Sequence, residues 1–290
     1  MERVWLIVNH FVESSKFSDL YRLLETSFRH RGVILEVRTT CDMMSALNER
    51  KGVEDLPRKM VFWDKDVILA KHLESIGVKL FNSANAIEVC DNKALTALVL
   101  SKAGVGMPLT VSAPKTFEGV GYSKVDFISR AADLLKYPMV IKEVYGSFGH
   151  QVYCAADYDA ACEIVRKIGY KDFIFQEFVA SSAGRDVRIN VVGGRYVAAM
   201  LRENSHDFRS NISNGGTMAQ YEPSMEEIDI AVKAVQAIGL DFAGVDVMFG
   251  PNGMPLICEV NSNPHFRSTL DCTGVNIADY IADLVIGRQS

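Results

Sequence analysis

The sequence predicts an α/β protein in which an N-terminal parallel βαβ domain precedes two α+β units, and three observations support this prediction. The first ninety residues alternate apolar runs with helical stretches. Two further pairs of apolar runs are each joined by a glycine turn, one at Gly193-Gly194 and one at "GPNG". Alternating strands and helices favour a parallel sheet, whereas short glycine turns favour antiparallel hairpins.

The N-terminal domain is expected over residues 1–89. Its first strand is the apolar run "RVWLIVN", and an amphipathic helix is expected to start at Ser18 and to stop at Gly32. The same hydrophobic spacing then predicts, in order, the strands "VILEVR" and "KMVFW", the helix "DVILAKHLESIG" and the strand "VKLFN".

The central unit is expected over residues 90–178. It opens with the helix "DNKALTALVLSKAG", which should turn Leu95, Leu98 and Val99 toward a core. The later elements are, in order, a helix near 125–135, the strand "PMVIKEV", the glycine-bearing loop "YGSFGHQV", a helix from Asp157 to Ile168 and the strand "FIFQEF".

The C-terminal unit is expected over residues 179–290. It should contain two hairpins, "RDVRINVV" with "RYVAAMLR" and "FAGVDVMF" with "PLICEVN". Between them, Ser224 and Glu227 have the spacing of a capping box for a helix that ends near Gly239. A last helix should begin near Asn276.

Composition narrows the class of protein. The 290 residues carry 31 basic and 36 acidic side chains, a net charge of -5, without a basic tract, so neither nucleic acid nor a membrane surface is an expected partner. The apolar run near the N-terminus is too short for a signal peptide or a membrane span. Six cysteines without a C-x-x-C motif indicate reduced thiols rather than disulfides or zinc. A cytoplasmic enzyme is therefore expected.

Polar residues interrupt the last two apolar strands. Glu259 and Asn261 are two residues apart and point to the same face of their strand, and the "GPNG" turn can bring Asp246 beside them. Two buried carboxylates would repel unless a cation lay between them. These oxygen donors suit Mg²⁺, and the alternative is that Glu259 and Asn261 only end an edge strand.

A phosphate site is the second hypothesis. Lys142 interrupts an apolar strand and is followed by the glycine-bearing loop, so its ammonium and the loop amides can hold phosphate together. The alternative is an outward lysine whose stem reaches to water. Walker A and G-x-G-x-x-G motifs are absent from the sequence, which excludes the common P-loop and dinucleotide fingerprints.

Charged residues also alternate along the first C-terminal hairpin. Asp186 and Arg188 share one face of a strand, and Arg202 ends the partner strand. Arg209 and Asn211 follow in the polar loop "HDFRSNISNGG". Such alternation usually marks a solvated face, but these strands are otherwise apolar, so the pattern favours a cleft.

Taken together and in this order, the motifs resemble the ATP-grasp superfamily, and specifically its RimK-like amino-acid ligases of the glutamate type. The matching segments cover nearly the whole chain: "NKALTALVLSKAGVGMP", "MVIKEVYGSFGHQV", "FIFQEFV", "GRDVRINVVGGRYVAAMLRE", "DFRSNISNGG", "GVDVMF", "EVNSNP" and "TGVNIADYI". The resemblance implies an ATP-grasp fold, in which the central and C-terminal subdomains clamp ATP.

The resemblance also implies roles for individual residues. ATP would be held by Lys93 and Lys142 at its phosphates, by the loop with Gly146 and Gly149 above them, by Gln176, Glu177 and Phe178 near the adenine, by Asp186 near the ribose, and by Arg209, Ser210 and Asn211 at the phosphate and acyl end. The ligands of Mg²⁺, or of Mn²⁺ in its place, would be Asp246, Glu259 and Asn261.

In the implied reaction, a substrate carboxylate attacks the γ-phosphate of ATP, and an amine then attacks the resulting acyl phosphate. Arg188, Arg202 and Arg209 are the candidates for holding that acyl phosphate or its oxyanion, with Asn211 as a further catalytic residue. The expected partners are small-molecule or peptide carboxylates and amines, or a carrier protein, and a homo-oligomer is expected.

Two alternatives to this function stay open at the level of sequence. One is a catalytically silent nucleotide-binding regulatory protein of the same fold, although the complete set of lysines and metal ligands favours an enzyme. The other is an ATP-grasp ligase that acts on a carboxylate other than an amino acid.

The segment "NPHFR" departs from the small residues that family members carry after the metal-binding asparagine. Asn263 and Arg267 are therefore candidate substrate residues, and the guanidinium of Arg267 could pair with a substrate carboxylate. The alternative for Arg267 is a salt bridge to Asp271, one helical turn away. His265 and His206 are considered as bases for the amine, but a surface histidine is the more common case.

Overall fold

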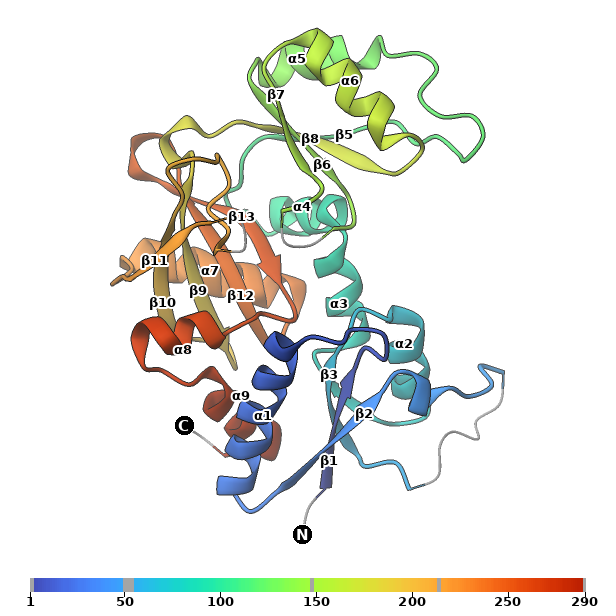
Figure 1. The fold of residues 1–290 in the computed structure, drawn as a ribbon, viewed down its shortest axis with the longest axis vertical. Coiled ribbons are helices and arrows are strands. Elements are labelled where there is room, and N and C mark those ends of the chain that lie inside the picture. The colour runs from blue at the N-terminus through green and yellow to red at the C-terminus, as the bar shows by residue number, and fades with distance from the viewer. Residues whose placement is uncertain (1–2, 49–54, 147–148, 213–214, 289–290) are drawn as a thin grey trace.

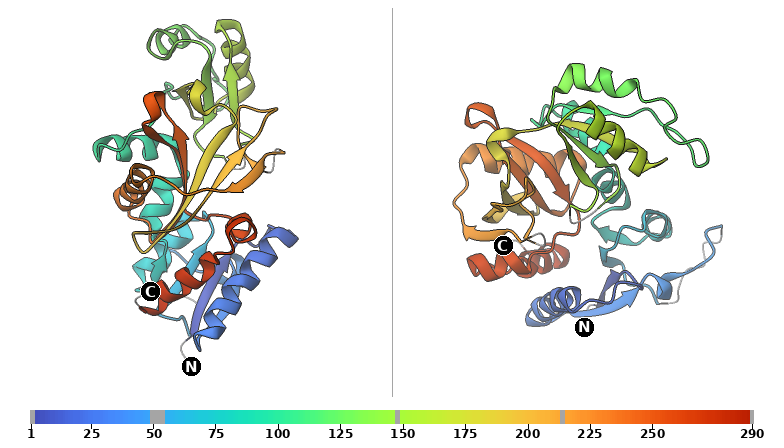
Figure 2. Two further views of the ribbon diagram at one scale, coloured as in Figure 1. Left: turned by 90° about the vertical axis from the view of Figure 1, so that its left-hand side faces the viewer. Right: turned by 45° about the horizontal axis from the view of Figure 1, so that its top comes forward.

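The computed structural model describes residues 3–48, 55–146, 149–212 and 215–288, and the chain folds around three β-sheets (Figure 1). The N-terminal sheet lies at the lower right of Figure 1, the central sheet at the top and the C-terminal sheet at the left. In the left view of Figure 2, the central sheet lies at the top, the N-terminal sheet at the bottom and the C-terminal sheet between them. The predicted mixed α/β fold is confirmed.

The N-terminal sheet is parallel and has the strand order β2-β1-β3-β4. Its strands are β1 (Arg3–Val8), β2 (Ile34–Thr39), β3 (Lys59–Trp63) and β4 (Lys79–Phe81). Because β2 and β3 lie on opposite sides of β1, the strand order reverses between β1 and β3. In open α/β sheets, ligands bind at the carboxyl ends of the strands at such a switch point.

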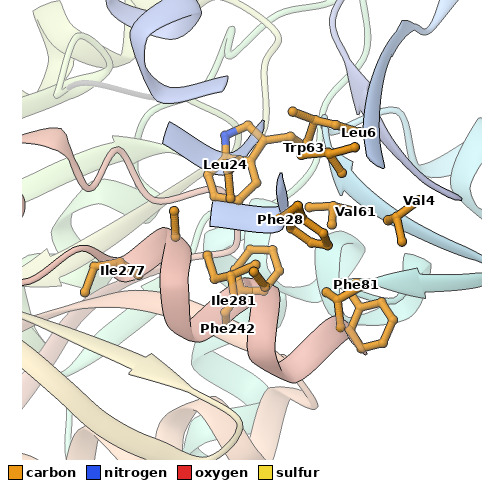
Figure 3. Packing of buried hydrophobic residues seen from close by; sticks show 14 of the residues in the cluster. Val4, Leu6, Leu24, Phe28, Val61, Trp63, Phe81, Phe242, Ile277 and Ile281 are labelled. Atoms are coloured by element: carbon orange, nitrogen blue, oxygen red, sulfur yellow. The ribbon is translucent and has the colours of Figure 1, made fainter. Parts of the chain in front are cut away.

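One face of this sheet is covered by two helices from opposite ends of the chain, α1 (Ser15–His30) and α9 (Ile277–Ile286). Figure 3 shows their apolar side chains packed around Trp63 and Phe242. Arg31, just after α1, donates from Nε to Asp283 of α9 at 2.6 Å and from a terminal nitrogen to Asp279 at 2.9 Å. The packing of α9 on the N-terminal sheet was not predicted. The start of α1 at Ser15 is three residues earlier than expected.

The other face is covered by α2 (Val67–Ser75) and α3 (Ala84–Asp91), and α4 (Lys93–Lys102) follows. The helix predicted from Asp91 is confirmed as α4, and Val99 packs against a core cluster as expected, but the prediction that Leu95 and Leu98 face a core is wrong, and α3 was not predicted. Asn92 has an extended backbone that separates α3 from α4, and its side chain caps α4. Thr96 and Leu100, four residues apart, face the interior, so Leu95 and Leu98 lie on the opposite side and are 37% and 67% exposed.

The central sheet is antiparallel with the order β5-β8-β6-β7. Its strands are β5 (Thr110–Ser112), β6 (Met139–Glu143), β7 (Val152–Ala155) and β8 (Phe173–Glu177), and α5 (Phe127–Leu135) and α6 (Tyr158–Ile168) pack against it. The strands β6 and β8 and both helices were predicted. The short strands β5 and β7 were not predicted, and β7 starts within the segment predicted as a glycine-bearing loop.

The C-terminal sheet is antiparallel with the order β11-β10-β9-β12-β13. Its strands are β9 (Arg185–Val192), β10 (Arg195–Glu203), β11 (Thr217–Gln220), β12 (Phe242–Phe249) and β13 (Pro255–Asn261), and the helices are α7 (Met225–Ile238) and α8 (Arg267–Thr273). Both predicted hairpins are confirmed, as is the capping box of Ser224 and Glu227 on α7. The fully exposed edge strand β11 was not predicted.

Asn82, which is completely buried after β4, ties the N-terminal sheet to the C-terminal one. Its Nδ2 donates to the carbonyl oxygens of Phe242 at 3.0 Å and Ser262 at 2.9 Å. Its Oδ1 accepts from the backbone amides of Asp241 at 2.6 Å and Phe242 at 3.1 Å. All hydrogen-bonding capacity of one amide is thus used to fix the position of the β12–β13 hairpin against β4.

The cysteines and the hydropathy of the helices were also considered in the sequence. The six cysteines are free. Among the described residues, no helix has the length and apolar character required to cross a membrane.

Candidate active site

Two cavities adjoin the C-terminal sheet. The first lies between the central and C-terminal sheets, and the second, which is the larger, lies between the C-terminal sheet and the N-terminal sheet with its helix α1. They share a boundary, to which α4, the loop after β6, β10 with the loop that follows it, β12 and β13 contribute. The shared residues are Lys93, Gly146, Arg202, Asn211, Asp246 and Glu259.

The first cavity is lined by all eleven residues predicted to contact the nucleotide. They are Lys93, Lys142, Gly146, Gly149, Gln176, Glu177, Phe178, Asp186, Arg209, Ser210 and Asn211. They come from both sheets that enclose the cavity, and apolar side chains such as Val140, Val179 and Met248 lie among them. Residues 147–148 of the predicted glycine-bearing loop lie outside the described part of the chain.

Two lysines face this cavity. Lys142 on β6 is only 8% exposed, so the alternative of an outward lysine is wrong. Its Nζ lies 3.9 Å from the Sγ of Cys258 on β13. Lys93 begins α4 and donates to the carbonyl oxygen of Gly146 at 3.1 Å. Burial lowers the pKa of Lys93, the Glu259 carboxylate opposes this shift, and the charge of Lys142 adds to it.

The end of the cavity away from the shared boundary is built by β8 and the residue after it. The Nε2 of Gln176 donates to the hydroxyl of Thr110 at 2.9 Å, which holds its amide group in place. The Glu177 carboxylate accepts from the backbone amide of Leu109 at 3.2 Å. Phe178 presents its ring to the cavity. Apolar and amide groups at this end can accommodate a planar base.

Along β9, β10 and β12, opposite charges pair across the strands. Arg202 donates twice to Asp186, at 2.7 Å each, and once to Asp246, at 3.0 Å. Arg188 donates through both Nε and a terminal nitrogen to Asp246. Ser210 donates its hydroxyl to Asp186 at 2.6 Å. All five side chains are buried, so the alternation predicted from sequence marks a cleft and not a solvated face.

These pairs fix the charge state of Asp246. Burial alone would raise its pKa, but the adjacent guanidinium groups of Arg188 and Arg202 outweigh burial and hold the pKa below its usual value. Burial likewise acts to lower the pKa of Arg202, and Asp246 and Asp186 overcome this effect and raise it. Asp246 and Arg202 therefore stay ionised.

Arg209 connects the loop after β10 to the central sheet. Its guanidinium pairs with Asp207, at 2.6 Å for the shortest contact, and donates to the carbonyl oxygen of Gly149 at 2.6 Å. One side chain therefore bridges the two loops that cover the first cavity. Asn211, two residues on, lines both cavities.

Two of the predicted metal ligands, Asp246 and Glu259, lie at the shared boundary, and the third, Asn261, lines the second cavity beside them. Asp246 and Glu259 are directly opposed on β12 and β13, and a bulge at Cys258 precedes this pair. Asn261 donates its Nδ2 to the carbonyl oxygen of Gly244 at 3.4 Å, so its Oδ1 is available as a ligand. Within the described ranges, the Glu259 carboxylate makes no direct hydrogen bond or ion pair.

This donor set fits a hard divalent cation. Two carboxylates and an amide supply oxygen ligands, and those of Glu259 and Asn261 are not committed to another group. The Asp246 carboxylate already accepts from two arginines, so it would be shared between them and the cation. Considering only His, Cys, Asp and Glu, no group of three that could hold a metal occurs among the residues that the structure places.

The second cavity opens at the switch point of the N-terminal sheet. Asn9 follows β1, Asp64 and Lys65 follow β3, and Lys16 and Tyr21 come from α1. Sequence reasoning did not identify these five residues. The available signal was a polar residue directly after each of two apolar strands that turned out to be neighbours.

The predicted substrate residues behave differently from each other. Asn263 lines the second cavity, and its buried Oδ1 has no hydrogen-bond partner among the residues described. Arg267 lies outside both cavities on α8 and pairs with Asp271 at 2.8 Å, which is the alternative considered from sequence.

The two histidines also differ. His265 lines the second cavity, and its Nε2 is 3.2 Å from the carbonyl oxygen of Lys16, to which it donates. Burial lowers the pKa of His265. His206 is exposed and lines neither cavity.

Comparison with known proteins agrees with this architecture. Residues 90–285 match the RimK-like ATP-grasp domain. The chain therefore belongs to the RimK-like ATP-grasp family of ligases, as its sequence motifs had indicated, and the fold of this family binds ATP. Human beta-citrylglutamate synthase B is 35% identical over 237 residues, a match that covers 79% of this chain and 60% of that protein. The chain thus spans less than two thirds of this relative.

Solved structures share the fold. A RimK-domain ATP-grasp protein from Sphaerobacter thermophilus superposes with a TM-score of 0.76 at 21% identity, covering 98% of this chain and 100% of that one. The ATP-grasp ligase PsnB, in a complex with a precursor variant, Mg and ADP, superposes with a TM-score of 0.73 at 17% identity, covering 98% and 97%.

Proposed function

We propose that the protein is an ATP-dependent carboxylate-amine ligase that forms an amide bond through an acyl phosphate. The observation that carries the proposal is the shared boundary of the two cavities. A nucleotide in the first cavity and a carboxylate in the second would meet at Lys93, Arg202 and Glu259, where phosphoryl transfer needs charge neutralisation.

In the first cavity, Lys93 and Lys142 would neutralise phosphate oxygens, and Gln176, Glu177 and Phe178 would position the base. Asp246, Glu259 and Asn261 would hold Mg²⁺, or Mn²⁺ in its place, which supplies further neutralisation of the phosphates when bound. Arg209 would keep the covering loops together, because it already bonds to the Gly149 carbonyl. Exclusion of water by these loops would protect an acyl phosphate from hydrolysis.

The reaction would proceed in two steps. The substrate carboxylate attacks the γ-phosphorus, the bond to ADP breaks, and an acyl phosphate forms. The amine nitrogen then attacks the acyl carbon, loses a proton, and expels phosphate from the tetrahedral intermediate. Arg202, at the shared boundary, and Arg188, beside it in the second cavity, would stabilise the negative charge of both steps, with Asn211 as a further donor.

The amine substrate in this proposal is an amino acid, with glutamate as the first candidate because a relative is named for a product that contains it. The acceptor could also be a peptide end or a carrier protein, because the second cavity is open and larger than the first. A cytoplasmic location and a homo-oligomeric state belong to the same proposal, and the six free cysteines support the former.

The proposal is tested by measuring phosphate release from Mg-ATP with a panel of carboxylates and amino acids, followed by mass spectrometry of the products. We expect phosphate release that requires a carboxylate and a product that is heavier by one amino acid less water. Tight nucleotide binding without turnover on the whole panel would instead support the alternative of a regulatory protein.

A further inference from the structure

Asp64 is a buried carboxylate that the proposed mechanism does not use. It follows β3 at the switch point of the N-terminal sheet, lines the second cavity and is 8% exposed. Its Oδ1 accepts from the backbone amide of Asp66 at 2.8 Å. Throughout the described part of the chain, no lysine, arginine or histidine forms an ion pair with it.

The groups around Asp64 do not supply a full positive charge that is paired with its carboxylate. Burial and the Asp64 carboxylate together raise the pKa of Tyr21 to about 12, so the phenol stays neutral. Lys65, the next residue, is paired with Asp91. The helix α2 (Val67–Ser75) begins three residues after Asp64, and its amino end offers only partial positive charge.

A carboxylate that is largely removed from water and lacks a cationic partner carries a desolvation cost. A cationic group of a ligand would offset that cost. The opposite end of the same cavity carries Lys93, Arg188 and Arg202, which suit an anionic acyl phosphate. The shared boundary therefore holds cations together with the carboxylates of Asp246 and Glu259, whereas Asp64 at the switch point is a carboxylate to which no described side chain forms an ion pair.

We propose that Asp64 binds the ammonium group of the amine substrate in the second cavity. This inference rests on the proposed ligase function and specifies the residue that selects an amine over an uncharged analogue. Asn9, at the end of the neighbouring strand β1, lies beside Asp64 because Val8 and Trp63 are paired in the sheet. It supplies an amide next to the carboxylate.

The test is calorimetric binding of the twenty standard amino acids, and of the matching 2-hydroxy acid for each amino acid that binds, to the full chain and to Asp64→Asn. The substitution keeps an oxygen that can accept from Asp66, so the turn is retained. We expect the wild type to prefer the amino acid over its hydroxy analogue by at least ~10-fold, and Asp64→Asn to lose that preference. Asp19→Asn, which removes a charge outside both cavities, is the matched control and should keep it.

Equal binding of the amino acid and its hydroxy analogue by the wild type, an unchanged preference in Asp64→Asn, or no binding of any amino acid would overturn the inference. Carboxylate-dependent formation of ADP in a single turnover without any amine is measured in parallel. If ADP forms in Asp64→Asn, the ligase proposal stands regardless of the role of Asp64. If the wild type itself forms no ADP, the ligase proposal fails separately.

Discussion

The two cavities differ in how their residues are brought together. The first is lined by every residue that the motifs assigned to the nucleotide, and most of these lie within a few positions of a strand in one of two adjacent sheets. The second combines the ends of β1 and β3 with the start of α1 and residues 260–265, which are distant in sequence. A site made from local patterns can be recognised in a sequence, whereas one made by packing distant segments cannot.

The largest expected effect concerns the first cavity. Lys142→Met keeps the volume of the side chain but removes a buried cation from the proposed phosphate site, so kcat/KM for ATP should fall about 100-fold or more. The measurement is a coupled assay of ADP formation. Lys115→Met, at an exposed lysine outside this cavity, is the control. Activity of Lys142→Met within tenfold of wild type would remove this lysine from the mechanism.

The next effect concerns the shared boundary. Glu259→Gln replaces the uncommitted carboxylate of the proposed metal site by a weaker ligand, so the Mg²⁺ concentration for half-maximal activity should rise by ~10-fold or more. Mn²⁺ binding followed by electron paramagnetic resonance in the presence of ADP should weaken in parallel. Glu226→Gln, exposed on α7, should change neither value. An unchanged Mg²⁺ requirement in Glu259→Gln would place the cation elsewhere.

A smaller effect concerns the contact between the C-terminal sheet and β4. Burial raises the pKa of Asp241, next to Asn82, to about 6, while Lys79 opposes the shift. The folded state thus binds the proton more tightly than the unfolded state, and stability falls as pH rises from about 4 to about 6. Asp241→Asn should be more stable than wild type by about 1–3 kcal/mol above pH 6, with the gain shrinking at lower pH.

Thermal and urea unfolding at pH 4.5 and pH 8 measure this difference. Asp126→Asn, which changes the same charge at an exposed position, is the control. A gain in stability that is independent of pH would show that Asp241 is ionised at both values.

The smallest effect concerns α8. Arg267→Ala breaks the exposed pair with Asp271, which contributes at most about 0.5 kcal/mol, and removes nothing from either cavity. We therefore expect the KM values of all substrates to change less than about twofold. A selective rise in the KM of one carboxylate-bearing substrate would restore Arg267 as a substrate residue and extend the second cavity toward α8.

Particular residues explain what the sequence could and could not predict. Glu259 and Asn261 share a face because of strand periodicity, and Asp246 joins them through a short hairpin, so their proximity follows from local rules. Asp64 follows a strand as many turn residues do, and only the strand order next to β1 makes it part of a cavity. The position of α9 on the N-terminal sheet and the bonds of Asn82 also depend on tertiary packing.

The elements of the fold also divide into those set by local sequence, which were predicted, and those that local sequence does not mark, which were not. The capping box of α7 and both C-terminal hairpins are set by residues within a short stretch, and they were predicted. The strand β5 has three residues and β11 is fully exposed, so neither carries a hydrophobic pattern of its own. The break between α3 and α4 depends on a single residue, Asn92, whose side chain caps α4.

The central claim is that the phosphates of ATP end where the two cavities meet. A crystal structure with Mn²⁺ and a non-hydrolysable ATP analogue tests it most directly, because the anomalous signal locates the ion independently of the protein coordinates. The account predicts an ion about 2.1 Å from oxygens of Glu259 and Asn261, with the terminal phosphate facing the second cavity. A nucleotide whose phosphates point away from Glu259, or an ion bound elsewhere, would contradict it.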